Sequence, residues 1–87
     1  MEQLDLLSTL LGYFGAAVLV GAYFLNQSDR LPSDRWPYPA LNLLGSVLIL
    51  VSLVVHPNAP SIAIEIFWSA ISIYGLQKSL RALSRAA

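Results

Sequence analysis

Residues 6–25 contain no charged side chain. An α-helix rises about 1.5 Å per residue, so this stretch is long enough to cross a hydrocarbon core of about 30 Å. Two more apolar stretches follow, and the chain as a whole is only 11% charged, against about a quarter in a soluble domain. The sequence therefore predicts an all-α membrane protein. Residues 1–87 are expected to form one domain of three transmembrane helices, with spans of about 6–25, 39–55 and 61–77.

The basic residues indicate how the three spans are oriented. Residues 26–37 form a polar connection with Pro32 and Pro37, and Pro39 follows two residues later; such a proline-rich connection separates two helices. With three spans, this connection and the C-terminus lie on the same side of the membrane. Because basic residues favour the cytoplasmic side, we expect the N-terminus outside and the C-terminus in the cytoplasm. All the basic residues are on that one side: Arg30, Arg35, Lys78, Arg81 and Arg85.

The third span has a polar face and an apolar face. At about 100° per residue, one stripe holds Ser61, Glu65, Trp68, Ser69, Ser72 and Gly75. The opposite side holds Ile66, Phe67, Ala70, Ile73 and Tyr74. A carboxylate facing lipid is costly, so the polar stripe is expected to face protein or a wet cavity. The second span has a similar stripe of Asn42, Gly45, Ser46, Ile49 and Ser52.

Small residues indicate where helices pack closely. Gly12 and Ala16, and then Ala17 and Gly21, are separated by four residues in the first span. Such pairs allow two membrane helices to approach each other, although glycine and alanine are also simply common in membrane helices. The predicted helix-packing residues are Gly12, Ala16, Gly21, Gly45 and Gly75.

Glu65 is the one ionisable residue well inside a span. It is either a carboxylate that binds a solute or a proton, or a helix-start carboxylate near the positive end of the helix dipole. Trp68 and Tyr13 are predicted at a similar depth, where they could form an aromatic-walled pocket for a sugar ring or a small cation. Asn42 and Tyr23 are candidates in the cytoplasmic half. The candidate substrate- or proton-binding residues are Glu65, Trp68, Tyr13, Asn42, Ser69 and Ser72.

The sequence lacks the patterns of common catalytic sites. It has no cysteine and one histidine, and neither a glycine-rich phosphate loop nor an HExxH motif is present. We therefore expect no enzyme, no metal site and no cofactor. The five basic residues form no nucleic-acid patch, so the expected surroundings are the lipid bilayer and other membrane helices.

Three short helices, an outside N-terminus, LLGYFGAA in the first span and SIAIEIFWSAISIYGL in the third resemble the bacterial half-sized sugar transporters, the SemiSWEETs of the PQ-loop superfamily. That resemblance implies a PQ-loop-like half-transporter bundle in a bacterial inner membrane. The chain departs from the family where Leu25-Asn26-Gln27 replaces its Pro-Gln hinge, and where the second span lacks the family's pocket tryptophan. The LNLLG and E-x-x-W motifs are closer to a group of small uncharacterised three-helix inner-membrane proteins, which implies the fold but no activity.

Two functions follow from these observations. Three helices alone cannot enclose a substrate path, so a two-fold homodimer with the polar stripes facing inward would form a half-transporter for a small solute. The alternative is a non-catalytic accessory subunit of a larger respiratory or photosynthetic membrane complex, in which the Glu65 stripe docks on a partner.

Overall fold

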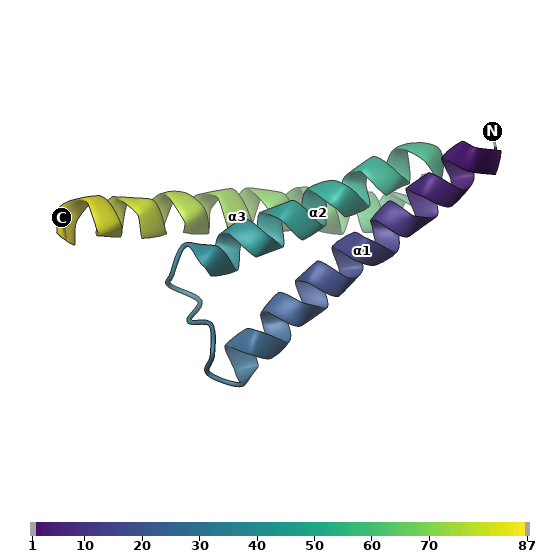
Figure 1. Cartoon of the computed structure of the whole chain (residues 1–87). Helices are drawn as coiled ribbons and strands as arrows, with labels where there is room; N and C mark the ends of the chain where they lie inside the picture. Colours follow the sequence, from purple (N-terminus) through teal and green to yellow (C-terminus); the bar gives the residue numbers. More distant parts are fainter. Residues whose placement is uncertain (1, 87) are drawn as a thin grey trace.

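A computed structural model describes residues 2–86 as three helices and no strand: α1 (Glu2–Gln27), α2 (Pro37–Val55) and α3 (Ala59–Ala86) (Figure 1). All three helices are long and apolar enough to cross a membrane. This confirms the predicted all-helical architecture. The helices extend beyond the predicted spans, most of all α3, which continues without a break from the third span through the basic C-terminal segment.

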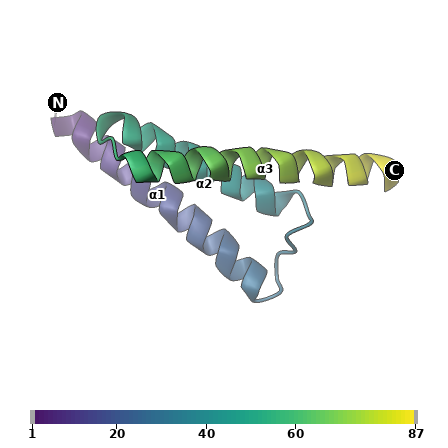
Figure 2. The same ribbon diagram turned by 180° about the vertical axis from the view of Figure 1, so that it is seen from behind.

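Helix α2 lies between the other two helices. It contacts both α1 and α3, whereas no Cα atom of α1 lies within 8 Å of one in α3. Figures 1 and 2 show that α1 meets α2 near the N-terminus of the chain and then diverges from it toward the loop of residues 28–36. The predicted three-helix bundle is therefore open between α1 and α3.

The contact between α1 and α2 is made by small residues. A Cβ atom on Gly12 would lie 2.7 Å from Ser52 Oγ, and one on Gly15 would lie 2.7 Å from the Gly45 carbonyl oxygen. Ser8 Oγ donates a hydrogen bond of 2.9 Å to the Ser52 carbonyl oxygen. Helices approach this closely only where side chains are absent or very small.

The buried side chains are mostly polar or small. On α2, Asn42, Gly45 and Ser46 are buried, and on α3, Glu65 and Ser72 are buried. On α3, every residue of the predicted apolar side is exposed, namely Ile66, Phe67, Ala70, Ile73 and Tyr74. This confirms the predicted outer side of α3 and the buried polar stripe of α2, whereas Trp68, which was predicted on the inner stripe of α3, is 44% exposed. The burial of small and polar residues also suits a lipid surrounding, because association there depends on close packing and interhelical hydrogen bonds.

The packing prediction was wrong for one pair of small residues. A Cβ atom on Gly21 would meet nothing within 4 Å, and Ala17 is exposed. The reason is the side of α1 on which they lie. On one side, Leu19 lies against Gly45 and Ala22 is buried. Ala17 and Gly21 are on the side turned away from α2. Two other predicted packing residues lie nearer to a neighbour. A Cβ atom on Gly75 would lie 3.4 Å from Pro39 Cβ, and Ala16 is half-buried.

The two ends of the molecule differ in charge. The loop of residues 28–36 and the C-terminus lie at one end, and the N-terminus and the α2–α3 turn lie at the other (Figure 2). The turn is capped by Asn58, whose Oδ1 accepts a hydrogen bond of 3.0 Å from the Ser61 amide, and His56 lies 3.5 Å from Asp5. All five basic residues belong to the loop or to the C-terminal part of α3, so they gather at a single end.

Candidate functional site

A hydrogen bond joins two of the predicted site residues across α2 and α3. Trp68 Nε1 donates to Asn42 Oδ1 at 3.0 Å. The amide nitrogen of Asn42 donates to the Tyr38 carbonyl oxygen at 2.8 Å, one turn earlier in α2. Asn42 is 4% exposed, and both ends of its amide are therefore satisfied. Its position is fixed by its own helix, and it in turn orients the indole of Trp68.

The sequence placed Asn42 in the cytoplasmic half and Trp68 nearer the outer end, and the structure brings them together. Trp68 is nine residues into α3 and Asn42 is thirteen residues before the end of α2. Both positions are well inside the helix pair, because the antiparallel helices run past each other. Because the turn is short, residues at similar distances from it lie side by side, and the distances of Asn42 and Trp68 from the turn differ by only four residues.

A groove borders this pair on the α2–α3 side. It has a volume of about 380 Å³, and we call it the Asn42 groove. Its walls combine the aromatic rings of Tyr38 and Trp68 with the buried hydroxyl-bearing Ser72. The complete lining is Ser33, Tyr38, Pro39, Asn42, Trp68, Ile71, Ser72 and Gly75.

A second groove lies between α1 and α3, where these helices stand apart. It has a volume of about 410 Å³ and is called here the Glu65 groove. Glu65 is only 8% exposed, and its Oε1 is buried without a hydrogen-bond partner. Trp68 lines this groove as well as the Asn42 groove, so its indole separates the two. The complete lining is Leu19, Val20, Tyr23, Ile64, Glu65 and Trp68.

Tyr13 was wrongly predicted as part of this pocket. Its side chain is 72% exposed, and it lines neither groove. Tyr23, which the sequence placed in the cytoplasmic half away from Glu65, lines the Glu65 groove instead. The cause is again the side of α1 that faces α2. Gly12 and Gly15 lie on that side, whereas Tyr13 is turned away from both partner helices.

Two serines add unpaired polar groups inside the protein. Ser46 is fully buried, and Ser46 Oγ has no hydrogen-bond partner. Ser69 Oγ is also buried without a partner. Buried polar atoms are nearly always hydrogen-bonded, so each such atom calls for an explanation, such as a bound water or ligand. Together with Glu65, they place three unsatisfied polar side chains on α2 and α3.

Sequence reasoning identified Gly12 and Gly45, which both lie in the contact between α1 and α2, but it missed Ser8 and Gly15. Ser8, Gly12, Gly15, Leu19 and Ala22 are spaced alternately by four and three residues, which is the pattern of a helix seam that meets another helix. Reading this alternation, rather than pairs four residues apart, identifies the contact face. Within residues 2–86, no group of three or more His, Asp or Glu side chains could hold a metal ion.

Comparisons with known proteins identify a family but no activity. The chain has no significant match among curated proteins or solved structures. One protein-family model matches residues 8–83, a range that includes all of α2 and every candidate site residue. The resemblance to the half-sized sugar transporters stays a prediction. By this match over nearly the whole chain, the protein belongs to the family whose model covers residues 8–83.

Proposed function

We propose that this protein is a non-enzymatic integral membrane protein that works as a homodimeric half-transporter for a small solute, with Glu65 as the group that binds the solute or a proton. The observation that carries the proposal is the buried Glu65 Oε1 without a hydrogen-bond partner, on a groove that is open between α1 and α3. An ionisable side chain within a membrane helix is expensive and usually marks a solute or proton pathway.

The open side of the molecule supports the dimer. Because no Cα atom of α1 lies within 8 Å of one in α3, one chain leaves the Glu65 groove open on one side. A second copy related by a two-fold axis would supply the missing wall with the same surface. The resulting six-helix unit would enclose the two Glu65 side chains in one central region, as in transporters built from repeated halves.

The lining of the Glu65 groove favours a small organic cation over a sugar. A carboxylate needs a positive partner when it is buried, and all five basic side chains of the chain lie at the far end, in the loop or the C-terminal part of α3. Tyr23 and Trp68 present aromatic surfaces beside the carboxylate. A carboxylate flanked by aromatic rings is the usual arrangement for holding an ammonium group.

The membrane placement belongs to the same proposal. We place the protein in a bacterial inner membrane, with the loop of residues 28–36 and the C-terminus in the cytoplasm. The gathering of the basic residues at that end supports this orientation.

A second candidate is an accessory subunit of a larger membrane complex. Helix α1 runs from Glu2 to Gln27 without a break, so the chain lacks the hinge that the half-sized transporters carry at the inner end of their first helix. In this alternative, a basic side chain of a partner helix enters the Glu65 groove and pairs with the carboxylate.

Ligand-dependent thermal stability of the purified protein tests the proposal. Tetramethylammonium and choline are expected to raise the unfolding temperature of the wild type, and Glu65→Gln is expected to abolish the rise without reducing expression. Glu2→Gln is the matched control, because it removes an exposed carboxylate at the start of α1 and should leave the rise unchanged.

The other outcomes separate the candidates. No stabilisation by cations, sugars or amino acids, together with co-purification of a larger complex that Glu65→Gln disrupts, would favour the accessory subunit. Stabilisation that persists in Glu65→Gln would remove the carboxylate from the binding site.

A further inference from the structure

The C-terminal part of α3 extends past the region that a bilayer core can hold. Helix α3 has 28 residues, whereas about 20 residues span the hydrocarbon core. Counted from Ala59, the core ends near Ser79. The side chains of Lys78, Arg81 and Arg85 then lie at the level of the lipid headgroups or beyond it.

These three basic residues follow one another on a single stripe of the helix. Their spacings of three and four residues place them on one face. Within the described chain, His56–Asp5 is the sole contact within 4.0 Å between a basic and an acidic side chain, so none of the three has a carboxylate partner. They border a shallow hollow with a volume of about 280 Å³, which is also lined by Tyr74, Gln77 and Ala82.

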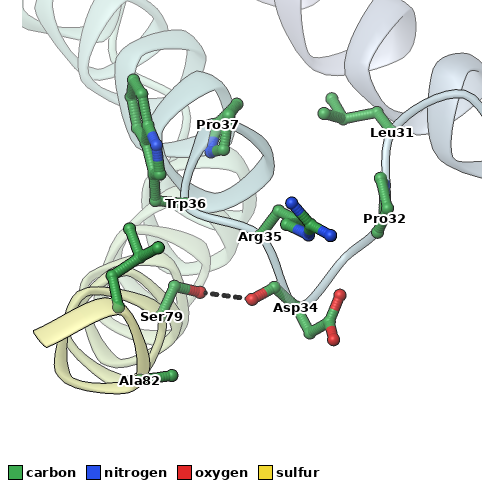
Figure 3. Close-up of a pocket in the computed structure, with 9 residues that line it drawn as sticks. Leu31, Pro32, Asp34, Arg35, Trp36, Pro37, Ser79 and Ala82 are labelled. Atoms are coloured by element: carbon green, nitrogen blue, oxygen red, sulfur yellow. Dashed lines mark hydrogen bonds between the residues drawn. The ribbon is translucent and has the colours of Figure 1, made fainter. Parts of the chain in front are cut away.

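A larger, mostly apolar hollow adjoins the basic one. Its volume is about 570 Å³, and it lies between the loop and α3, with Leu31, Trp36 and Leu83 among its walls. Figure 3 shows the loop passing close to α3, where Ser79 Oγ donates a hydrogen bond of 2.9 Å to the Asp34 carbonyl oxygen. Ala82 lines both hollows, so a basic pocket and an apolar pocket meet along this helix.

We infer that this end of the protein binds an anionic phospholipid, with the phosphate on the Lys78, Arg81 and Arg85 stripe, beside the hollow that Trp36 and Leu83 line. Unpaired arginine and lysine side chains complement a phosphate, and Trp36 is of the type that occupies the headgroup level. The inference depends on the membrane placement proposed above, and it depends on neither transport nor dimerisation. A failure of the Glu65 experiment therefore leaves it standing.

Lipid retention in detergent tests the inference. The full chain is incubated with equal amounts of phosphatidylglycerol and phosphatidylcholine of identical acyl chains, and the retained lipid is measured by native mass spectrometry. The wild type is expected to retain phosphatidylglycerol in preference. Each basic residue near a charged lipid surface contributes a factor of about five, so Arg81→Gln and Lys78→Gln are each expected to lower the preference by about fivefold.

Arg30→Gln is the matched control. Arg30 is an exposed arginine at the same end of the molecule, and it lines neither hollow, so its loss should leave the preference unchanged. Equal retention of the two lipids by the wild type would overturn the inference. An equal loss in Arg30→Gln and Arg81→Gln would also overturn it, because overall charge would then be the cause. Displacement of the lipid by equimolar inorganic phosphate would mean that the site binds free phosphate and not a lipid.

Discussion

Gly15 and Gly45 face each other so closely that neither has room for a side chain. A Cβ atom on Gly15 would lie 2.7 Å from the Gly45 carbonyl oxygen, and one on Gly45 would lie 2.8 Å from the Gly15 carbonyl oxygen. In both directions the obstacle is backbone, which cannot move aside as a flexible side chain can. The place where α1 meets α2 is therefore set by these two glycines.

Gly15→Ala and Gly45→Ala are each expected to lower the stability of the α1–α2 pair. Inserting a methyl group into a tightly packed contact costs about 1–3 kcal/mol. The measurement is the free energy of unfolding in detergent, with circular dichroism as the probe of unfolding. Gly21→Ala is the control, since a Cβ atom there meets nothing within 4 Å. If Gly21→Ala were as destabilising as Gly45→Ala, helix composition rather than the contact would be responsible.

The hydrogen bond between Trp68 and Asn42 is expected to hold α3 against α2. Trp68→Phe removes the donor, and Asn42→Leu removes the acceptor. Polar contacts between membrane helices contribute about 0.6–2 kcal/mol, so a double-mutant cycle on unfolding free energies should give a coupling in that range. Additive effects of the two substitutions would mean that the indole and the amide do not interact in the folded protein.

Much of the fold could be predicted from the sequence. In a chain this apolar, the number of helices follows from the lengths of the uncharged stretches and from the positions of the charged residues between them. Periodicity then places a residue such as Glu65 on the inner face and Phe67 on the outer face, because a helix has a fixed repeat. These are local properties, and the structure confirms them.

The candidate site was harder to predict because it depends on how the helices are placed relative to one another. Whether Tyr13 or Tyr23 lies beside Glu65 depends on which side of α1 faces α2. That side includes Gly15, which meets Gly45, a residue 30 positions away in the sequence. A single sequence indicates which faces are buried, but it does not indicate which residue meets which across an interface.

The orientation in the membrane is expected to follow the basic residues. A reporter that is active only in the cytoplasm should work when it is fused to the C-terminus and should fail at the N-terminus. The same gathering of charge predicts that replacing the five basic residues with glutamine gives a mixture of orientations. An N-terminal reporter that is active in the wild type would reverse the topology and place the Glu65 groove nearer the cytoplasmic side.

Cysteine cross-linking can decide whether a second copy covers the Glu65 groove. The chain has no cysteine, so a double variant with Val20→Cys and Ile64→Cys carries only these two thiols. Both residues line the groove from opposite sides. A disulfide requires Cα atoms within about 7 Å, and no Cα of α1 comes within 8 Å of α3 in one chain. Any disulfide between these two positions must therefore join two chains.

We expect mild oxidation of this double variant in membranes to give a covalent dimer on a non-reducing gel. The control is Tyr13→Cys with Phe67→Cys, whose side chains are 72% and 69% exposed and do not line the groove. This control should stay monomeric, because its positions face lipid in the proposed dimer. Similar dimer yields from the two variants would indicate random collision. A groove variant that stays monomeric while the control cross-links would place the contact between copies on the outer faces, and Glu65 would then have no second copy to complete its site.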